Sequence, residues 1–94
     1  MIVLLLGGCL TYADGKAQEG TLNCQIMDAC GTLEKVGYTD VDDCIAAAQG
    51  QAYDENQCPN YSAEREQECL DAYTAALNAK ECEPALDECG TVCG

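Results

Sequence analysis

The sequence contains no histidine, tryptophan or phenylalanine, and Ser62 is its only serine. Without histidine there is no histidine general base, catalytic triad or histidine metal ligand. No Cys-x-x-Cys pair occurs, which argues against a thioredoxin-like site and against the usual zinc spacing. No glycine-rich phosphate-binding motif is present either. We therefore expect a protein that is not an enzyme, with no cofactor and no metal.

Basic residues are also scarce, because the chain has 17 acidic residues against four basic ones and a net charge of −13. A chain without a basic patch has no means of releasing the counterions of a nucleic acid, so we expect no nucleic-acid partner. The acidic residues are spread along the chain, which is typical of a solvated, self-repelling surface.

Large apolar residues are few, and 94 residues allow one small domain. Cysteine, with nine residues, is abundant. An even number of cysteines in a short exported chain indicates a disulfide framework, and each bridge typically stabilises by about 2–4 kcal/mol. We expect four bridges among the eight cysteines that follow Cys9: Cys24, Cys30, Cys44, Cys58, Cys69, Cys82, Cys89 and Cys93.

The remaining cysteine, Cys9, is the first in the chain and ends a short apolar run with the order Leu6-Gly7-Gly8-Cys9. These four residues resemble the lipobox of bacterial lipoproteins, in which the cysteine is lipidated and becomes the first mature residue. The resemblance implies that residues 1–8 are the remnant of a signal peptide and that Cys9 carries a lipid anchor. A signal of about 15–30 residues with a basic start is usual, so we expect the missing part to precede Met1.

The remaining chain predicts a flexible tether followed by a helical domain. Residues 9–20 are polar and contain two glycines, which is typical of a tether. Apolar residues then recur at helical spacing within residues 21–30, 39–49 and 62–80, and a short helix or turn is expected over 83–92. The predicted fold is all-α: a small disulfide-rich bundle of three to four short helices in residues 21–94, behind the tether.

Three aspartates, Asp40, Asp42 and Asp43, lie where the second helix is expected to begin. Their spacing starts like a calcium-binding loop, but Ile45 stands where that loop requires glycine. We therefore interpret them as helix-capping residues, with Thr39 as the N-cap.

The expected helices restrict the disulfide pairing only in part. We favour a Cys30–Cys44 bridge across the first helical hairpin and a Cys58–Cys93 bridge near the end of the chain. A Cys69–Cys82 bridge is excluded if the third helix is intact, because the helix rises about 1.5 Å per residue and separates the two cysteines.

A second resemblance covers most of the chain. Cys58-Pro59-Asn60-Tyr61, followed by Glu68-Cys69-Leu70-Asp71-Ala72 and then Cys82 and Cys89, is similar to small cysteine-rich bacterial lipoproteins of unknown function. It implies an exported protein, held by its lipid at the outer membrane or cell surface of a Gram-negative bacterium. Two functions remain open: a structural or interaction module that binds an envelope protein, and a carrier of a lipid or other small ligand.

Overall fold

The computed structural model describes residues 10–94, and this part of the chain is all-helical. Its three α-helices are α1 (Tyr12–Cys30), α2 (Val41–Gly50) and α3 (Ala63–Ala79). Three short 3-10 helices connect or follow them: η2 (Leu33–Val36), η3 (Glu55–Gln57) and η4 (Asp87–Thr91). The prediction of an all-α, disulfide-rich fold is confirmed.

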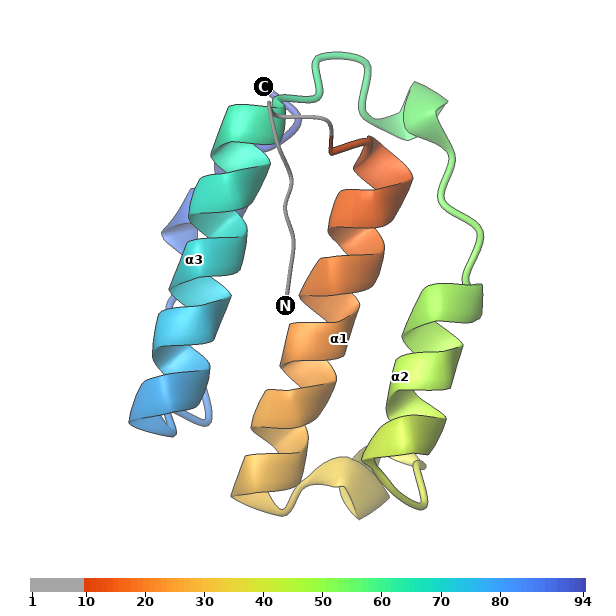
Figure 1. Ribbon diagram of the computed structural model, residues 1–94, viewed down its shortest axis with the longest axis vertical. Helices are drawn as coiled ribbons and strands as arrows, with labels where there is room; N and C mark the ends of the chain where they lie inside the picture. The colour runs from red at the N-terminus through yellow and green to blue at the C-terminus, as the bar shows by residue number, and fades with distance from the viewer. Residues whose placement is uncertain (1–9) are drawn as a thin grey trace.

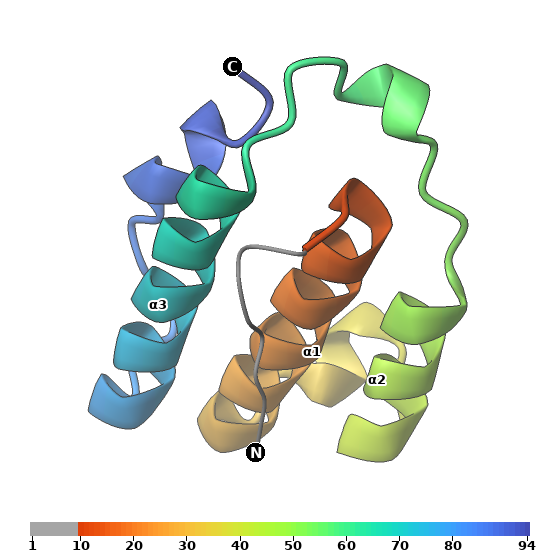
Figure 2. The same ribbon diagram turned by 45° about the horizontal axis from the view of Figure 1, so that its top comes forward.

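The helices form an open layer with α1 in the middle. Figures 1 and 2 show α2 and α3 on opposite sides of α1, and α1 packs against both. The C-terminal segment with η4 lies against α3. Buried side chains therefore lie between α1 and α2, between α1 and α3, and where the C-terminal segment meets α3, as with Val92.

The prediction of a tether over residues 9–20 is wrong for most of its length, because α1 begins at Tyr12. The side chain of Thr11 caps the helix by accepting a hydrogen bond from the backbone N–H of Asp14, over 3.1 Å. The two glycines that indicated flexibility lie where α1 meets its neighbours: Gly20 against Ala48 of α2 and Gly15 against Glu66 of α3. Tertiary packing outweighs the low helix propensity of glycine at these positions.

The other helix ends follow the sequence closely. Gly31 ends α1 with φ +70°, the left-handed conformation that favours glycine. Ser62 caps α3 by accepting from the backbone N–H of Arg65, and Lys80 ends that helix. At α2 the cap is displaced by one residue from the prediction, since Asp40 is the N-cap rather than Thr39.

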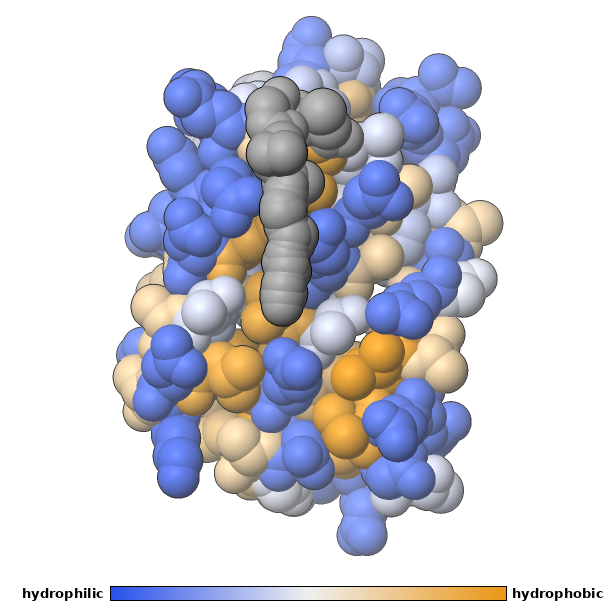
Figure 3. Space-filling model, in the orientation of Figure 1, coloured by the Kyte–Doolittle hydropathy of each residue, from blue (hydrophilic) through white to orange (hydrophobic). Residues whose placement is uncertain are grey.

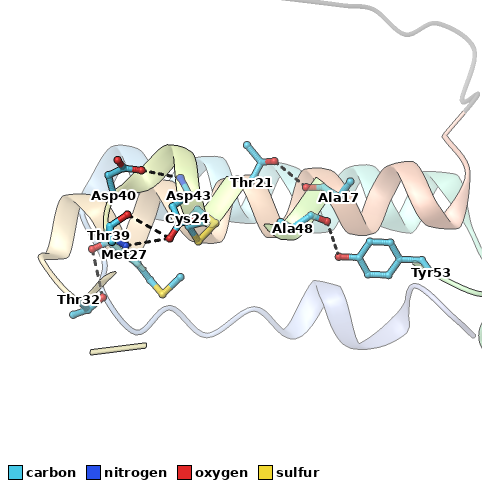
Figure 4. The surroundings of a disulfide bond; sticks show 11 residues. Ala17, Thr21, Cys24, Met27, Thr32, Thr39, Asp40, Asp43, Ala48 and Tyr53 are labelled. Atoms are coloured by element: carbon cyan, nitrogen blue, oxygen red, sulfur yellow. Dashed lines mark hydrogen bonds between the residues drawn. A yellow bond between two sulfur atoms is a disulfide. The ribbon is translucent and has the colours of Figure 1, made fainter. Parts of the chain in front are cut away.

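The seam between α1 and α2 is apolar and contains a disulfide. Cys24, Leu33 and Cys44 are buried together, and Met27, Tyr38, Val41 and Ile45 pack around them. Figure 4 shows this bridge with hydrogen bonds on both sides of it, from Tyr53 to the carbonyl of Ala48 and between Asp43 and Asp40.

All eight cysteines of the described residues are paired, as the sequence predicts. The bridges and their Cα–Cα distances are Cys24–Cys44 (5.8 Å), Cys30–Cys82 (5.8 Å), Cys58–Cys93 (5.0 Å) and Cys69–Cys89 (4.6 Å). The predicted Cys58–Cys93 bridge is confirmed, and Cys69 does not pair with Cys82.

The predicted Cys30–Cys44 bridge is wrong. Cys44 pairs with Cys24, and Cys30 pairs with Cys82 beyond the end of α3. The two cysteines of α1 are six positions apart in the sequence, so they point about 120° apart around the helix. Because α2 and α3 lie on opposite sides of α1, Cys24 faces one neighbour and Cys30 reaches the other side.

Candidate functional site

The predicted site residues fall into two groups. Cys9, the predicted lipidation site, lies outside the described residues. The other eight cysteines form the four disulfides and therefore act as crosslinks. Among residues 10–94, no helix is long and apolar enough to cross a membrane.

The unusual chemistry of the described chain is in the seam between α1 and α3. Glu66 of α3 is fully buried, with 0% of its surface exposed, and Glu19 of α1 is 8% exposed. Their carboxyl groups lie within hydrogen-bonding range of each other. Acidic side chains are rarely buried without a partner, because an isolated charge is strongly destabilised away from water.

Glycine makes the close approach of the two helices possible. A Cβ atom at Gly15 would overlap the carboxyl group and the side-chain carbons of Glu66. Gly15 is itself buried, and it lies one turn before Glu19 on the same side of α1. The backbone of α1 therefore forms one wall of the space that holds the carboxyl group of Glu66.

Two polar side chains contact the carboxyl pair. The hydroxyl group of Tyr61 donates to Oε1 of Glu66 over 3.3 Å, and Nζ of Lys16 lies 3.3 Å from Oε1 of Glu19. The remaining oxygens, Oε2 of Glu19 and Oε2 of Glu66, are buried and accept no hydrogen bond. Such orphaned acceptors are exceptional in folded proteins.

This environment favours the neutral form of Glu66. Burial and the neighbouring carboxyl group of Glu19 raise the pKa of Glu66 to about 8, against the smaller opposing effects of Lys16 and Tyr61. Burial and the Glu66 carboxyl group also raise the pKa of Tyr61, so its phenol remains neutral. Burial opposes the charge of Lys16, but Glu19, with smaller contributions from Tyr12 and Glu66, outweighs burial and raises the pKa of Lys16.

Aromatic rings cover the end of the seam nearest the start of α1. Tyr12 meets Tyr61 edge-on at 5.9 Å between ring centroids, and it meets Tyr53 at 6.3 Å. Nζ of Lys16 lies 5.8 Å from the centre of the Tyr12 ring. These contacts join the first turn of α1 to the loop between α2 and α3 and keep water from that end of the carboxyl pair.

The disulfide next to the pair does not make it a metal site. Side-chain atoms of Glu19, Cys69 and Cys89 lie within 4.8 Å of one another, a spacing that would suit a metal ion. The two sulfur atoms are bonded to each other, however, and a disulfide offers no thiolate ligand.

The burial of Glu19 and Glu66 was not predicted from the sequence, although the pattern of α3 indicates it for Glu66. Glu66, Cys69, Tyr73 and Ala76 follow one another at intervals of three and four residues, so Glu66 continues the apolar stripe of α3. An acidic residue on an apolar stripe indicates a buried carboxyl group. The burial of Glu19 could not be predicted, because residues 9–20 were assigned to a tether.

The surface hollows are open and of mixed polarity. A cavity of about 390 Å³ crosses α1, and polar side chains such as Gln18, Gln49 and Gln67 line it together with Leu22 and Leu70. On the face drawn in Figure 3, hydrophilic residues surround small apolar areas.

The chain matches no protein-family model, no curated protein and no solved structure.

Proposed function

We propose that the protein is a lipid-anchored cell-envelope protein whose helical domain acts as a non-catalytic structural or protein-interaction module. One observation carries the proposal: the eight cysteines after Cys9 pair with one another, so none of them is available to Cys9. The odd cysteine is the one that follows Leu6-Gly7-Gly8, and lipidation accounts for it. Four disulfides in a short chain also favour an oxidising compartment outside the cytoplasm.

The surface supports interaction rather than the transport of a lipid. The hollows at the surface are open and combine polar side chains with a few leucines, and the seam between α1 and α3 contains buried carboxyl groups. An acyl chain would require an apolar interior. The four disulfides hold the exposed side chains on a rigid body, which reduces the entropy that a partner must remove on binding.

The anchor is tested by detergent phase partitioning of the chain expressed in a bacterium behind a complete signal peptide. We expect the wild type in the detergent phase and Cys9→Ser in the aqueous phase, because serine offers no thiol for lipidation. Gly8→Ala is the matched control, since it keeps a small residue before the cysteine. Equal partitioning of Cys9→Ser and the wild type would refute the anchor.

The role of the domain is tested separately. Crosslinking on intact cells followed by identification of the captured envelope protein is expected to return the same partner with the wild type and with a chain held by an unrelated anchor. Native mass spectrometry of the purified, oxidised chain is expected to give the mass of the protein alone. A bound lipid in that spectrum would instead support the carrier.

A further inference from the structure

The first half of α1 has no covalent attachment to the helix beside it. The bridges of α1 start at Cys24 and Cys30, both in its second half. The bridge of α3 leads to η4, and the bridge at Cys58 leads to Cys93. Residues 12–19 are therefore held against α3 by packing and hydrogen bonds, and the carboxyl pair lies at the centre of this contact.

The charges in this contact do not balance when both carboxyl groups are ionised. The titratable and charged groups around the pair come from all the elements packed there: Tyr12, Asp14 and Lys16 of α1, Tyr73 of α3, Tyr61 of the loop, and Cys89 of η4, which is in a disulfide. Lys16 is the single cation among them. Two carboxylates with one ammonium group leave a net negative charge away from water, which opposes packing.

A single proton removes this imbalance. It neutralises one carboxyl group and lets that group donate to the other, so that orphaned acceptor oxygens are satisfied together. A divalent cation fits less well, because Ca²⁺ requires six to eight oxygen ligands and this site already holds the ammonium group of Lys16. The contact of Gly15 with Glu66 also leaves no room for additional ligands on that side.

We propose that a proton held between Glu19 and Glu66 docks the first half of α1 on α3, and that its loss releases residues 12–19 while the disulfide-bonded remainder stays folded. Once released, these residues lose their helical structure. Isolated helices shorter than about 12–15 residues are marginal in water, and this segment contains Gly15. Gly20 packs on Ala48 of α2, so we place the end of the released segment just before it.

Release would change the length of the link between the domain and a lipid at Cys9. As a helix, residues 12–19 rise about 12 Å along α3, whereas as a flexible chain they form a tether. The helical domain would then stand further from the membrane at alkaline pH than at acidic pH. This consequence rests on the proposed lipid anchor, but docking itself does not.

The test is a series of heteronuclear NMR spectra of the oxidised, full-length chain between pH 5.5 and 9.5. We expect the side-chain carboxyl carbon of Glu66 to titrate within this range. Over the same range, the backbone carbon shifts of residues 12–19 should lose their helical values, while those of residues 24–30 should keep them. Helical shifts of residues 12–19 that persist to pH 9.5, or a loss that spreads equally through α1, would overturn the proposal.

Two variants and one added salt test whether loss of the proton, rather than another cause, releases residues 12–19. Glu66→Gln retains a donor for Glu19 and cannot ionise, so its residues 12–19 should remain helical up to pH 9.5. Glu64→Gln removes one charge from the exposed side of α3 and should behave as the wild type. If Glu64→Gln also remained helical, general charge repulsion would be the cause and the proposal would fail.

Calcium chloride added at pH 9.5, against sodium chloride of equal ionic strength, should leave residues 12–19 disordered. Recovery of helical shifts with calcium alone would replace the proton by a metal ion and overturn the proposal. Because every spectrum is recorded on the chain without a lipid, a negative result here leaves the lipid anchor untouched. Failure of the anchor would likewise leave the docking proposal intact.

Discussion

Along α1, residues 20–30 carry two disulfides, one to α2 and one to the segment after α3, whereas residues 12–19 carry none. The bridged half packs around the buried cluster of Cys24, Leu33 and Cys44. The unbridged half packs through tyrosine rings and a pair of buried carboxyl groups. One continuous helix is thus attached by covalent, pH-insensitive links at one end and by titratable contacts at the other.

The difference shows how a small chain can be rigid in one region and responsive in another. A disulfide stabilises mainly by restricting the unfolded chain, so its contribution does not depend on the ionisation of carboxyl groups. A buried carboxyl pair stabilises packing only while its protonation state leaves no uncompensated charge. The two halves of α1 should therefore respond differently to the same perturbation.

Removal of the bridge between α1 and the segment after α3 should have the largest effect. The bridge closes a sequence separation of 52 residues, so the pair Cys30→Ser and Cys82→Ser should lower the free energy of unfolding by about 4 kcal/mol. Urea unfolding followed by circular dichroism measures the loss. The pair Cys24→Ser and Cys44→Ser, with a separation of 20, should lose about 3 kcal/mol in the same assay. An inverse order would show that native packing rather than chain entropy decides the contribution of each bridge.

The pH dependence of stability should come next. The pKa of Glu66 is raised from 4.5 to about 8 in the folded chain, so between these values the folded state holds a proton that the unfolded state has lost. The free energy of unfolding should therefore fall as the pH rises from 4.5 to 8, by several kcal/mol from this group. Glu66→Gln should remove that fall in urea titrations at successive pH values. Glu64→Gln should retain it, and a flat wild-type profile would contradict the prediction.

Filling the space at Gly15 should destabilise the unbridged half. Gly15→Ala gains about 1 kcal/mol of helix propensity, but its methyl group overlaps buried Glu66, and we expect a net loss of about 2 kcal/mol in thermal unfolding. In a Glu66→Ala background, which empties the space, the same substitution should cost less. Gly50→Ala is the control, because no atom lies within 4 Å of the added Cβ there. Equal effects at Gly15 and Gly50 would show that the helices separate easily.

The smallest effects should come from the helix caps, which also distinguish the unbridged half of α1 from the bridged part of the fold. Thr11 caps the unbridged end of α1, and Asp40 caps α2, which is bridged to α1 within its first turns. Asp40→Ala should lower global stability by about 1 kcal/mol. Thr11→Ala should mainly speed amide hydrogen exchange in residues 12–19 and change global stability less, because this half can open by itself. Equal global losses would show that α1 unfolds as one unit.

The sequence predicted α3 well because its signals are local. Ser62 caps its start, and the spacing of Cys69, Tyr73 and Ala76 marks its apolar side. The first half of α1 has no comparable signal, since its apolar side is made of Tyr12, Gly15 and Glu19. Glycine disfavours a helix and glutamate is usually exposed, so the local pattern assigns this segment to a tether.

The disulfide pairing was predictable only where the chain itself excluded alternatives. An intact α3 keeps Cys69 from Cys82, and the segment after α3 packs against that helix, so that Cys93 reaches Cys58 ahead of its start. The partners of Cys24 and Cys30 depend on which side of α1 each flanking helix occupies. That choice is made by long-range packing, and helix periodicity carries no information about it.

By itself, the sequence determined that this protein is a helical body crosslinked by four disulfides, because helix periodicity, caps and cysteine number are properties of the chain alone. Tertiary structure decided that α1 extends back to Tyr12 and that Glu19 and Glu66 share a buried seam. The physical reason is that a short helix with glycines and acidic residues becomes stable only when a second helix covers it. The same contact then changes the protonation of the carboxyl group that it buries.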